Sequence, residues 1–239
     1  QLVYQENFTR KKSGFVLPEV VEQMEKAQDQ IIRAEYKGPL VISGPAGSGK
    51  TTLALHRVAY LAQSPESADL FTPDKVLILV QDTGTKNYFS QLLPELGIQG
   101  IEIQTFADWA IGVLGLKGYF YVLGYGENGV ERIRYEYAKL QALQNNPEID
   151  YSKNSYIALI KIYEPYFDVK NMKLWQKQKV DKVLDRFDLT LLLSAYRKNK
   201  GVFQIEKEYF EELQNGNYRK RKGFFPAEYN LLIVDEFQN

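Results

Sequence analysis

The chain has 239 residues, of which 44% are hydrophobic and 25% are charged, and 30 Lys and Arg balance 30 Asp and Glu. This composition is typical of a globular protein long enough to bury a sizeable core. Without cysteine the chain forms no disulfide or thiolate metal site, and a single His argues against a His-based metal centre. There is no apolar run of about 20 residues and no signal segment, so we expect a cytoplasmic protein without a membrane span.

Charge is unevenly distributed along the chain. Residues 111–222 carry 20 Lys and Arg against 14 Asp and Glu, whereas the remainder is acidic. The strongest basic cluster is Tyr-Arg-Lys-Arg-Lys at 218–222. A surface that binds a polyanion and an ordinary solvated surface both fit this asymmetry, and both interpretations remain open.

In chain order, the first predicted element is a helix over residues 19–34, because Pro18 stands at a favourable helix start and apolar residues recur at helical spacing. We assign residues 1–20 to an N-terminal extension without a chemical role. The apolar run from Leu40 to Ser43 then predicts the first buried strand.

A glycine-rich segment, Gly-Pro-Ala-Gly-Ser-Gly-Lys-Thr at 44–51, follows that run and leads into a predicted helix over 51–62. This order is typical of a phosphate-binding loop, in which backbone N–H groups and a lysine meet the phosphates and a hydroxyl binds Mg²⁺. The residues predicted to contact the nucleotide are Gly44, Ala46, Gly47, Ser48, Gly49, Lys50, Thr51 and Thr52. Thr51 is also a predicted ligand of Mg²⁺.

The next segments complete a strand and helix alternation. Residues 76–80 form an apolar run without alternation, typical of a parallel strand covered on both faces. A polar turn is expected at 81–85, a helix at 86–96 that Gly97 ends, and a third strand at 101–105. The fold class is therefore α/β, a doubly wound sheet whose ligands sit at the carboxyl ends of the strands. The residues expected at that edge include Thr83, Thr85, Thr105 and Phe106.

The pattern changes between residues 111 and 222, where the spacing of apolar residues predicts helices rather than parallel strands. The expected helices are 131–143, 156–163, 171–186, 189–198 and 204–213. Tyrosines are dense here. Stacking platforms for bases are one use of tyrosine, and core or interface packing is the commoner one.

The last segment returns to the first pattern. Residues 229–234 predict a buried strand that delivers Asp235 and Glu236 to the sheet edge. An acidic pair at this position supplies the second half of an NTPase site, with Asp235 holding Mg²⁺ through water and Glu236 polarising the attacking water. Roughly 190 residues separate the two halves of the site, more than two further βα units need. We therefore predict a nucleotide-binding domain of residues 21–110 and 223–239, interrupted by a mostly helical subdomain at 111–222.

These motifs together resemble the superfamily-one helicases of the UvrD/Rep type and, within them, the HelD (helicase IV-like) branch. The resemblance rests on residues 27–33, 44–61, 92–97, 105–106 and 234–239. Its most specific part is Asp-Glu-Phe-Gln at 235–238. Two segments favour the HelD branch, Leu-Pro-Glu-Leu-Gly at 93–97 and Ala-Leu-His-Arg at 54–57.

The resemblance implies a RecA-like fold and a set of roles in binding ATP and Mg²⁺. Gln28 would read adenine, Lys50 would act on the phosphates, and Asp235 and Glu236 would be the metal-side acid and the catalytic base. Gln238 would sense the γ-phosphate and couple it to the nucleic-acid track. Contacts to nucleic acid are expected at Thr83, Thr105 and Phe106. Two departures are Thr52, where related proteins often have Arg, and residues 81–85, which do not spell the usual nucleic-acid motif.

The expected function is the ATP-binding portion of a DNA helicase or translocase that acts on single-stranded DNA or a duplex junction. The alternative is a HelD-like factor that uses ATP to bind and remodel RNA polymerase. Because the family carries a second RecA-like half, we expect this chain to be a fragment that binds ATP weakly and hydrolyses it negligibly alone.

Overall fold

The computed structural model describes residues 18–122, 129–145, 159, 161–167 and 169–236. They form an α/β structure with a small parallel sheet flanked by helices. The chain divides into two compact units, one of residues 1–78, 87–103 and 230–239 and one of residues 79–86 and 104–229. Among the described helices, none is both long and apolar enough to cross a membrane.

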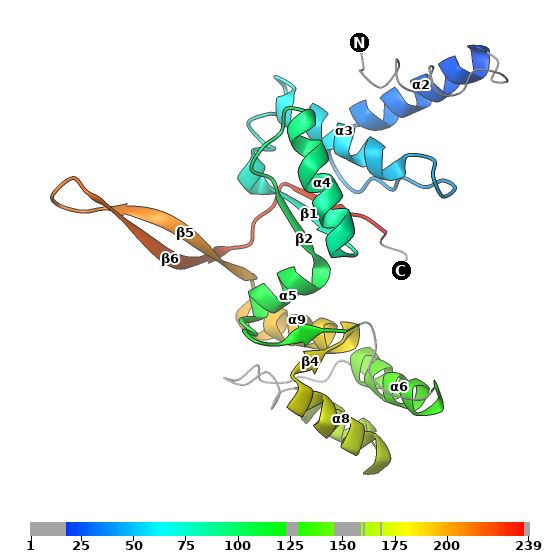
Figure 1. Cartoon of the computed structure of the whole chain (residues 1–239), viewed down its shortest axis with the longest axis vertical. Helices are drawn as coiled ribbons and strands as arrows, with labels where there is room; N and C mark the ends of the chain where they lie inside the picture. The colour runs from blue at the N-terminus through cyan, green and yellow to red at the C-terminus, as the bar shows by residue number, and fades with distance from the viewer. Residues whose placement is uncertain (1–17, 123–128, 146–158, 160, 168, 237–239) are drawn as a thin grey trace. The chain divides into compact units, whose positions relative to one another are not determined.

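The parallel sheet has three strands in the order β2-β1-β7. The central strand, β1 (Val76–Val80), is buried at all five positions, which confirms the strand predicted from its unbroken apolar run. Its neighbours are β2 (Glu102–Thr105) and β7 (Leu231–Val234), drawn together in Figure 1. Because β1 lies between two strands and under helices, every side chain on it must be apolar.

Two expectations about this sheet are wrong. The run from Leu40 to Ser43 forms no strand, and Leu40 and Val41 are 44% and 66% exposed. Strand β7 is not buried on both faces, since Leu232 and Val234 are about half exposed. An apolar run records only that a segment prefers burial, whereas strand formation needs a neighbouring backbone to pair with.

Helices α2 (Pro18–Arg33) and α3 (Lys50–Gln63) pack against each other in the first unit, as Figure 1 shows. Both match the predicted helices within a residue or two. A short 3₁₀ turn, η1 (Pro73–Lys75), leads into β1. Of the predicted apolar face of α2, Ile32 is buried and Ala27 is exposed.

Helix α4 (Thr83–Glu95) begins three residues before the expected start at Lys86. The Asp82 carboxylate accepts a hydrogen bond from the Thr85 backbone N–H at 2.9 Å and another from its hydroxyl at 3.1 Å, which is an N-cap. These bonds hold the pKa of Asp82 below its usual value. The expected polar turn is therefore mostly the first turn of the helix, and Gly97, at φ 79°, follows its end as predicted.

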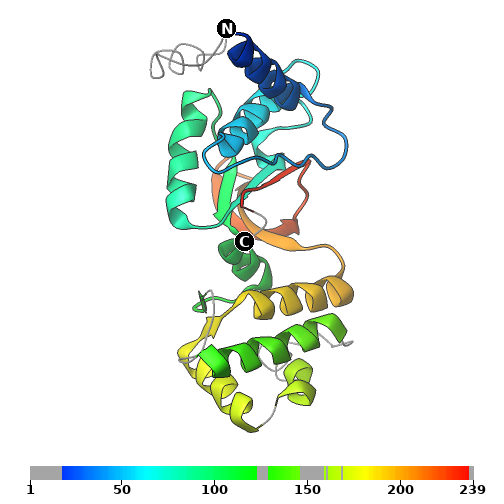
Figure 2. The same cartoon turned by 90° about the vertical axis from the view of Figure 1, so that its right-hand side faces the viewer.

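The described part of the second unit contains four longer helices and two short strands, besides the two longer strands introduced below. They are α5 (Phe106–Leu114), β3 (Phe120–Tyr121), α6 (Gly129–Asn145), α8 (Val169–Asp181), β4 (Val183–Leu184) and α9 (Arg186–Lys200), with a 3₁₀ turn η2 (Glu164–Tyr166). Strands β3 and β4 pair in parallel. Helices α6 and α9 lie side by side, and Figure 2 shows them in green and gold. The apolar core of this unit includes Trp175 on α8, Leu184 on β4, and Leu189 and Leu192 on α9.

Two helical predictions in this region need correction. The helix expected over 171–186 ends at Asp181, and β4 follows it. The helix expected over 204–213 is instead strand β5 (Gln204–Glu212), and the basic cluster at 218–222 lies in strand β6 (Tyr218–Pro226), paired antiparallel to β5. Glutamates favour a helix locally, but pairing with a complementary strand overrides that preference. Most of the helix expected at 156–163 lies outside the described residues.

A charged cluster is buried inside the helical core of the second unit. The Lys139 ammonium, fully buried, lies 2.6 Å from Asp185 Oδ2 and 2.8 Å from Asp188 Oδ1. The Tyr163 hydroxyl and the Gln178 amide also donate to Asp188, at 2.6 Å and 2.7 Å. Each buried charge thus has several partners, which is the condition for tolerating charges in a core.

Candidate nucleotide-binding site

The glycine-rich loop ends in a helix start that suits an anion. Gly47 and Gly49 have φ of 75° and 82°, a left-handed conformation in which a side chain would be strained. Gly49 is the N-cap of α3 and supplies no side-chain cap, and the first helical turn contains no acidic residue. The first N–H groups of α3 therefore remain available to phosphate oxygens at the positive end of the helix dipole.

Lys50 lies across this loop. Its Nζ donates to the carbonyl oxygens of Gly44 and Pro45, at 3.1 Å and 2.9 Å. At Gly44 an added Cβ would come within 2.9 Å of Ser48 Oγ, so the loop is too tight there for a side chain unless Ser48 shifts. The ammonium is thus held over the loop by acceptors that phosphate oxygens would replace.

The two predicted halves of the site meet at Thr51 and Asp235. The Thr51 hydroxyl, in the first turn of α3, donates to Asp235 Oδ1 at 3.0 Å, across 184 residues of sequence. Strand β7 delivers Asp235 to this point, since the aspartate follows Val234 directly. A hydroxyl oxygen and a carboxylate oxygen are ligands that Mg²⁺ favours, so these residues fit the ion that the sequence predicts.

Glu236 follows in a turn with φ 54°, left-handed for a residue that has a side chain. Such a conformation costs about 1–2 kcal/mol, and strained residues of this kind cluster at functional sites. The side chain is exposed. Gln238, predicted to sense the γ-phosphate, lies outside the described residues.

Gln28, the predicted adenine reader, is half-buried on α2, and its side chain makes no hydrogen bond within the described residues. Of the other loop residues, Ala46 and Ser48 are exposed and Thr52 is half-buried. Each predicted nucleotide residue of the described chain thus belongs to the first unit.

The residues predicted to contact nucleic acid lie at or just after the carboxyl ends of strands β1 and β2. Thr83 is exposed at the start of α4, and Phe106 is 39% exposed at the start of α5. Thr105 is buried, and its Oγ1 accepts a hydrogen bond from the Asp108 backbone N–H at 3.1 Å as the N-cap of α5. The Thr105 hydroxyl therefore has a structural role, whereas Thr83 and Phe106 present side chains to solvent.

Arg57 is a positioning residue that sequence analysis missed. It is buried on α3, and its guanidinium donates to four backbone carbonyls at the end of α2, at 2.9–3.1 Å from Ile31, Ile32, Ala34 and Glu35. A cation is favoured at a helix C-terminus, where carbonyls lack intrahelical partners. Its position among the apolar residues of a predicted helix could have indicated that this arginine is buried.

A separate cavity of about 220 Å³ lies near the ends of α2 and α3 that are remote from the loop. Its lining includes Arg33, Tyr60, Leu61 and Ser67, and none of the predicted nucleotide residues. With an axial rise of about 1.5 Å per residue, Tyr60 is about 15 Å along α3 from Lys50. This cavity therefore lies apart from the predicted nucleotide residues.

Comparison with known proteins identifies no relative of this chain. No protein-family model matches the chain, and no curated protein matches it.

Proposed function

We propose that this chain is the ATP-binding portion of an ATP-dependent helicase or translocase acting on single-stranded DNA, with a RecA-like fold. The observation that carries the proposal is the 3.0 Å hydrogen bond between Thr51 and Asp235. It joins the glycine-rich loop to the acidic strand end, two motifs that are far apart in sequence and are weak evidence separately. The Asp-Glu-Phe-Gln sequence at 235–238 supports the helicase class among phosphate-loop proteins.

Each residue near the loop has a distinct role in this proposal. Lys50 exchanges its carbonyl partners for phosphate oxygens, while the free N–H groups of α3 bind the same anion. Thr51 and Asp235 hold Mg²⁺, which neutralises phosphate charge when it is bound. Glu236 accepts the proton of the attacking water. Gln28 offers a donor and an acceptor to adenine, which selects ATP over GTP.

A second function is a factor that uses ATP to bind and remodel RNA polymerase. The observation that favours it is the exposed two-stranded ribbon of the second unit, because large aromatic side chains in solvent are typical of a protein-contact surface. The two functions share the nucleotide site and differ in whether DNA stimulates ATP hydrolysis.

Binding of a fluorescent ATP analogue, titrated with and without Mg²⁺, tests the nucleotide site. Lys50→Ala should weaken binding at least about tenfold, because the ammonium is the main cation offered to the phosphates. Asp235→Asn should abolish most of the dependence on Mg²⁺. Lys37→Ala, which removes an exposed lysine of the same unit, is the matched control and should leave affinity unchanged. Equal affinity of the Lys50→Ala variant and the native chain would contradict the assignment.

ATP hydrolysis by the full-length protein that contains this chain, with and without single-stranded DNA, separates the two functions. Stimulation by DNA of about tenfold or more, lost in Lys50→Ala, supports the nucleic-acid motor. Hydrolysis that is sensitive to Lys50→Ala but indifferent to DNA supports the polymerase-directed factor.

A further inference from the structure

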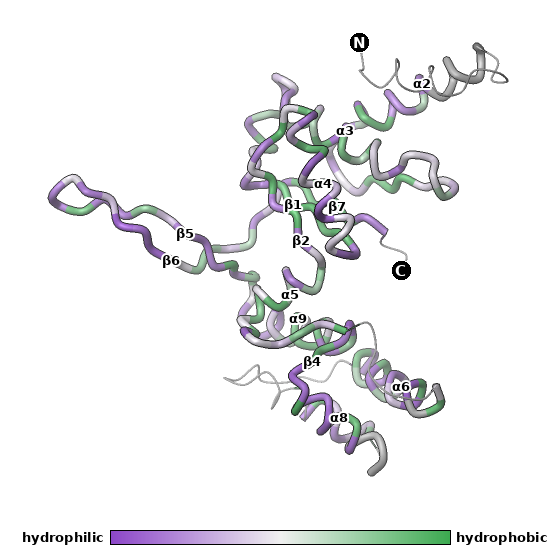
Figure 3. Tube along the Cα trace, viewed as in Figure 1, coloured by the Kyte–Doolittle hydropathy of each residue, from purple (hydrophilic) through white to green (hydrophobic). Residues whose placement is uncertain are grey.

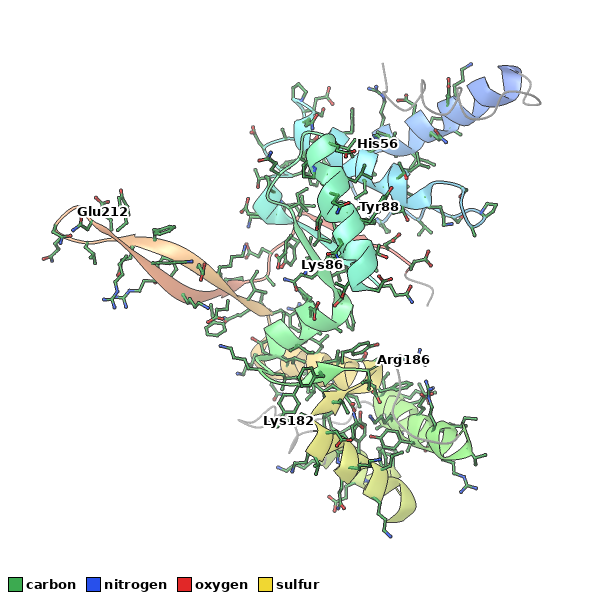
Figure 4. All side chains as sticks on the ribbon, in the orientation of Figure 1. His56, Lys86, Tyr88, Lys182, Arg186 and Glu212 are labelled. Carbon is green, nitrogen blue, oxygen red and sulfur yellow. The ribbon has the colours of Figure 1, made fainter. Side chains whose placement is uncertain are left out.

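Strands β5 and β6 form a ribbon of two strands, and no third strand pairs with either of them in the described part of the chain. Their register runs from Gln204 opposite Pro226 to Glu212 opposite Tyr218. A tight turn closes the ribbon, with the Leu213 N–H donating to the Asn217 carbonyl at 2.8 Å. Figure 4 labels Glu212 near this turn and shows side chains projecting from both strands.

One face of the ribbon carries large aromatic side chains in solvent. Residues opposite each other in an antiparallel pair point to the same face, so Phe210, Tyr218 and Phe224 share one. They are 70%, 67% and 67% exposed. A two-stranded ribbon is marginally stable in water by itself. Aromatic residues gathered on such a ribbon therefore indicate a surface that a partner covers.

Charge is separated between the two strands. Strand β5 contains four glutamates, whereas β6 contains the consecutive cations Arg219 to Lys222, seen as a hydrophilic stretch in Figure 3. Three ion pairs cross the ribbon, Lys220 to Glu208 at 2.6 Å, Arg221 to Glu211 at 2.8 Å and Lys222 to Glu206 at 4.0 Å. The inner edge of β6 is thus already matched to an acidic strand.

The outer edge of β6 exposes backbone groups that pair with no strand in the described part of the chain. Hydrogen bonds from Leu213 to Asn217 and from Ala227 to Phe203 place odd-numbered residues of β6 in the inward-facing pairs. By alternation, the N–H and C=O groups of Lys220 and Lys222 point away from β5. Such an edge accepts a further strand.

We propose that the outer edge of β6 binds an extended acidic segment of another protein by β-strand addition. The segment would place acidic side chains beside Lys220 and Lys222 and apolar side chains beside Tyr218 and Phe224. Strand β5 shows which kind of strand pairs with β6, because β5 is itself acidic and contains aromatic residues. Backbone hydrogen bonds supply affinity in this mode, and the flanking side chains supply specificity.

Charge argues against a symmetric pair of copies at this edge. A twofold axis would set β6 against β6, with four cations on each strand, and like charges opposite each other are destabilising. The same pattern is a device by which an exposed edge avoids pairing with itself. An acidic strand from a different protein would not bring like charges opposite each other.

The test measures binding of a labelled peptide, acetyl-Tyr-Thr-Glu-Thr-Glu-Thr-Tyr-amide, to the chain by fluorescence anisotropy. Its two glutamates and two tyrosines match the side chains of β6 on the aromatic face. We expect saturable binding, and none by the peptide with lysine in place of glutamate. Absence of binding by the acidic peptide at concentrations up to about 1 mM would overturn the proposal.

Two variants at one position separate strand addition from simple charge attraction. Lys222→Pro removes an outward N–H without breaking the bonds to β5, because proline is tolerated at a strand edge. Lys222→Thr removes the same charge and keeps the N–H. We expect Lys222→Pro to weaken peptide binding at least about fivefold more than Lys222→Thr does.

A nucleic acid is the competing ligand of a basic strand. Equal losses in the two Lys222 variants, together with binding of an oligothymidylate that both weaken equally, would overturn strand addition in favour of a phosphate contact. Circular dichroism and thermal melting of each variant check that the ribbon and the unit remain folded. Nucleotide affinity at Lys50 should be unaffected, so this test is independent of the proposed ATP site.

Discussion

Arg57 fixes the end of one helix through another. Its guanidinium satisfies four carbonyls of the segment 31–35, while the rest of the side chain is buried on α3. No other residue type offers several donors in a planar array, and lysine would reach fewer carbonyls. Because Gln28 lies on the same helix, Arg57 also sets the position of the predicted adenine contact.

Replacing Arg57 should therefore destabilise the first unit and loosen α2. We expect Arg57→Met, which keeps the volume of the stem, to lower the free energy of unfolding by about 3 kcal/mol, since buried carbonyls lose charged donors. Arg57→Lys should cost less. Urea unfolding followed by circular dichroism measures both, with Arg33→Met, at an exposed arginine at the end of α2, as the control. A change no larger than that of the control would contradict the capping role.

Helix α9 begins in a capping box that is also part of the buried charge cluster. The Asp185 carboxylate accepts from the backbone N–H groups of Phe187 and Asp188, and Asp188 Oδ2 accepts from the Asp185 N–H at 2.9 Å. The two carboxylates share one ammonium, that of Lys139, and all three groups are buried away from the screening effect of water. Burial, and then the charge of Asp188, raise the pKa of Asp185 to about 6, against the lowering effect of Lys139.

This pKa makes the stability of the second unit depend on pH. The folded state holds the Asp185 proton more tightly than the unfolded state does. Protonation of Asp185 therefore adds to the free energy of unfolding in full below about pH 4, and this contribution is lost as pH rises through about 6. The loss amounts to about 3 kcal/mol at most. Asp185→Asn, which is always neutral, should lack it.

Urea unfolding from pH 4 to pH 7.5, followed by the fluorescence of the two tryptophans, measures this difference. The free energy of unfolding of the native chain, relative to that of Asp185→Asn, should fall as pH rises across this window. Asp181→Asn, at an exposed aspartate of the same unit, is the control and should keep the native profile. Parallel profiles for the native chain and Asp185→Asn would show that Asp185 titrates normally.

The chain as a whole separates its candidate functions between its two units. The predicted nucleotide residues that the structure describes lie in the first unit, whereas the buried charge cluster and the β5–β6 ribbon lie in the second. Each unit has its own buried apolar residues, around β1 and α3 in the first and around α6, α8 and α9 in the second. A ligand of the loop therefore acts first on the stability of the first unit.

Hydrogen exchange with and without Mg²⁺ and ATP tests this division. A ligand present at about 100 times its Kd stabilises the state that binds it by about 2.7 kcal/mol. Amides of α3 and of β7 should therefore exchange more slowly with ligand, and the effect should vanish in Asp235→Asn. Amides in the core of α9 should change little. Protection confined to α9 would place the nucleotide elsewhere.

Local patterns in the sequence were sufficient to predict those elements whose backbone conformation does not depend on a partner distant in sequence. The unbroken apolar run of β1, the helix start at Pro18 and the loop glycines each determine their own backbone, through burial, φ restriction or φ freedom. The loop residues 44–52 could be listed for the same reason, since their motif is contiguous, whereas Gln28, Asp235 and Glu236 come from separate motifs. The α/β class follows from the order of these elements.

Pairing and burial of charge were decided only by the tertiary structure. The sequence of residues 204–213 favours a helix, yet those residues form a strand because β6 offers complementary charges in register. Residues 40–43 look like a strand and pair with nothing in the described chain. Lys139 is buried because partners from α8 and α9 converge on it. The sequence by itself thus determined the glycine-rich loop and the order of the elements around it, whereas strand partners and buried ion pairs depend on residues distant in sequence, whose contacts no local pattern records.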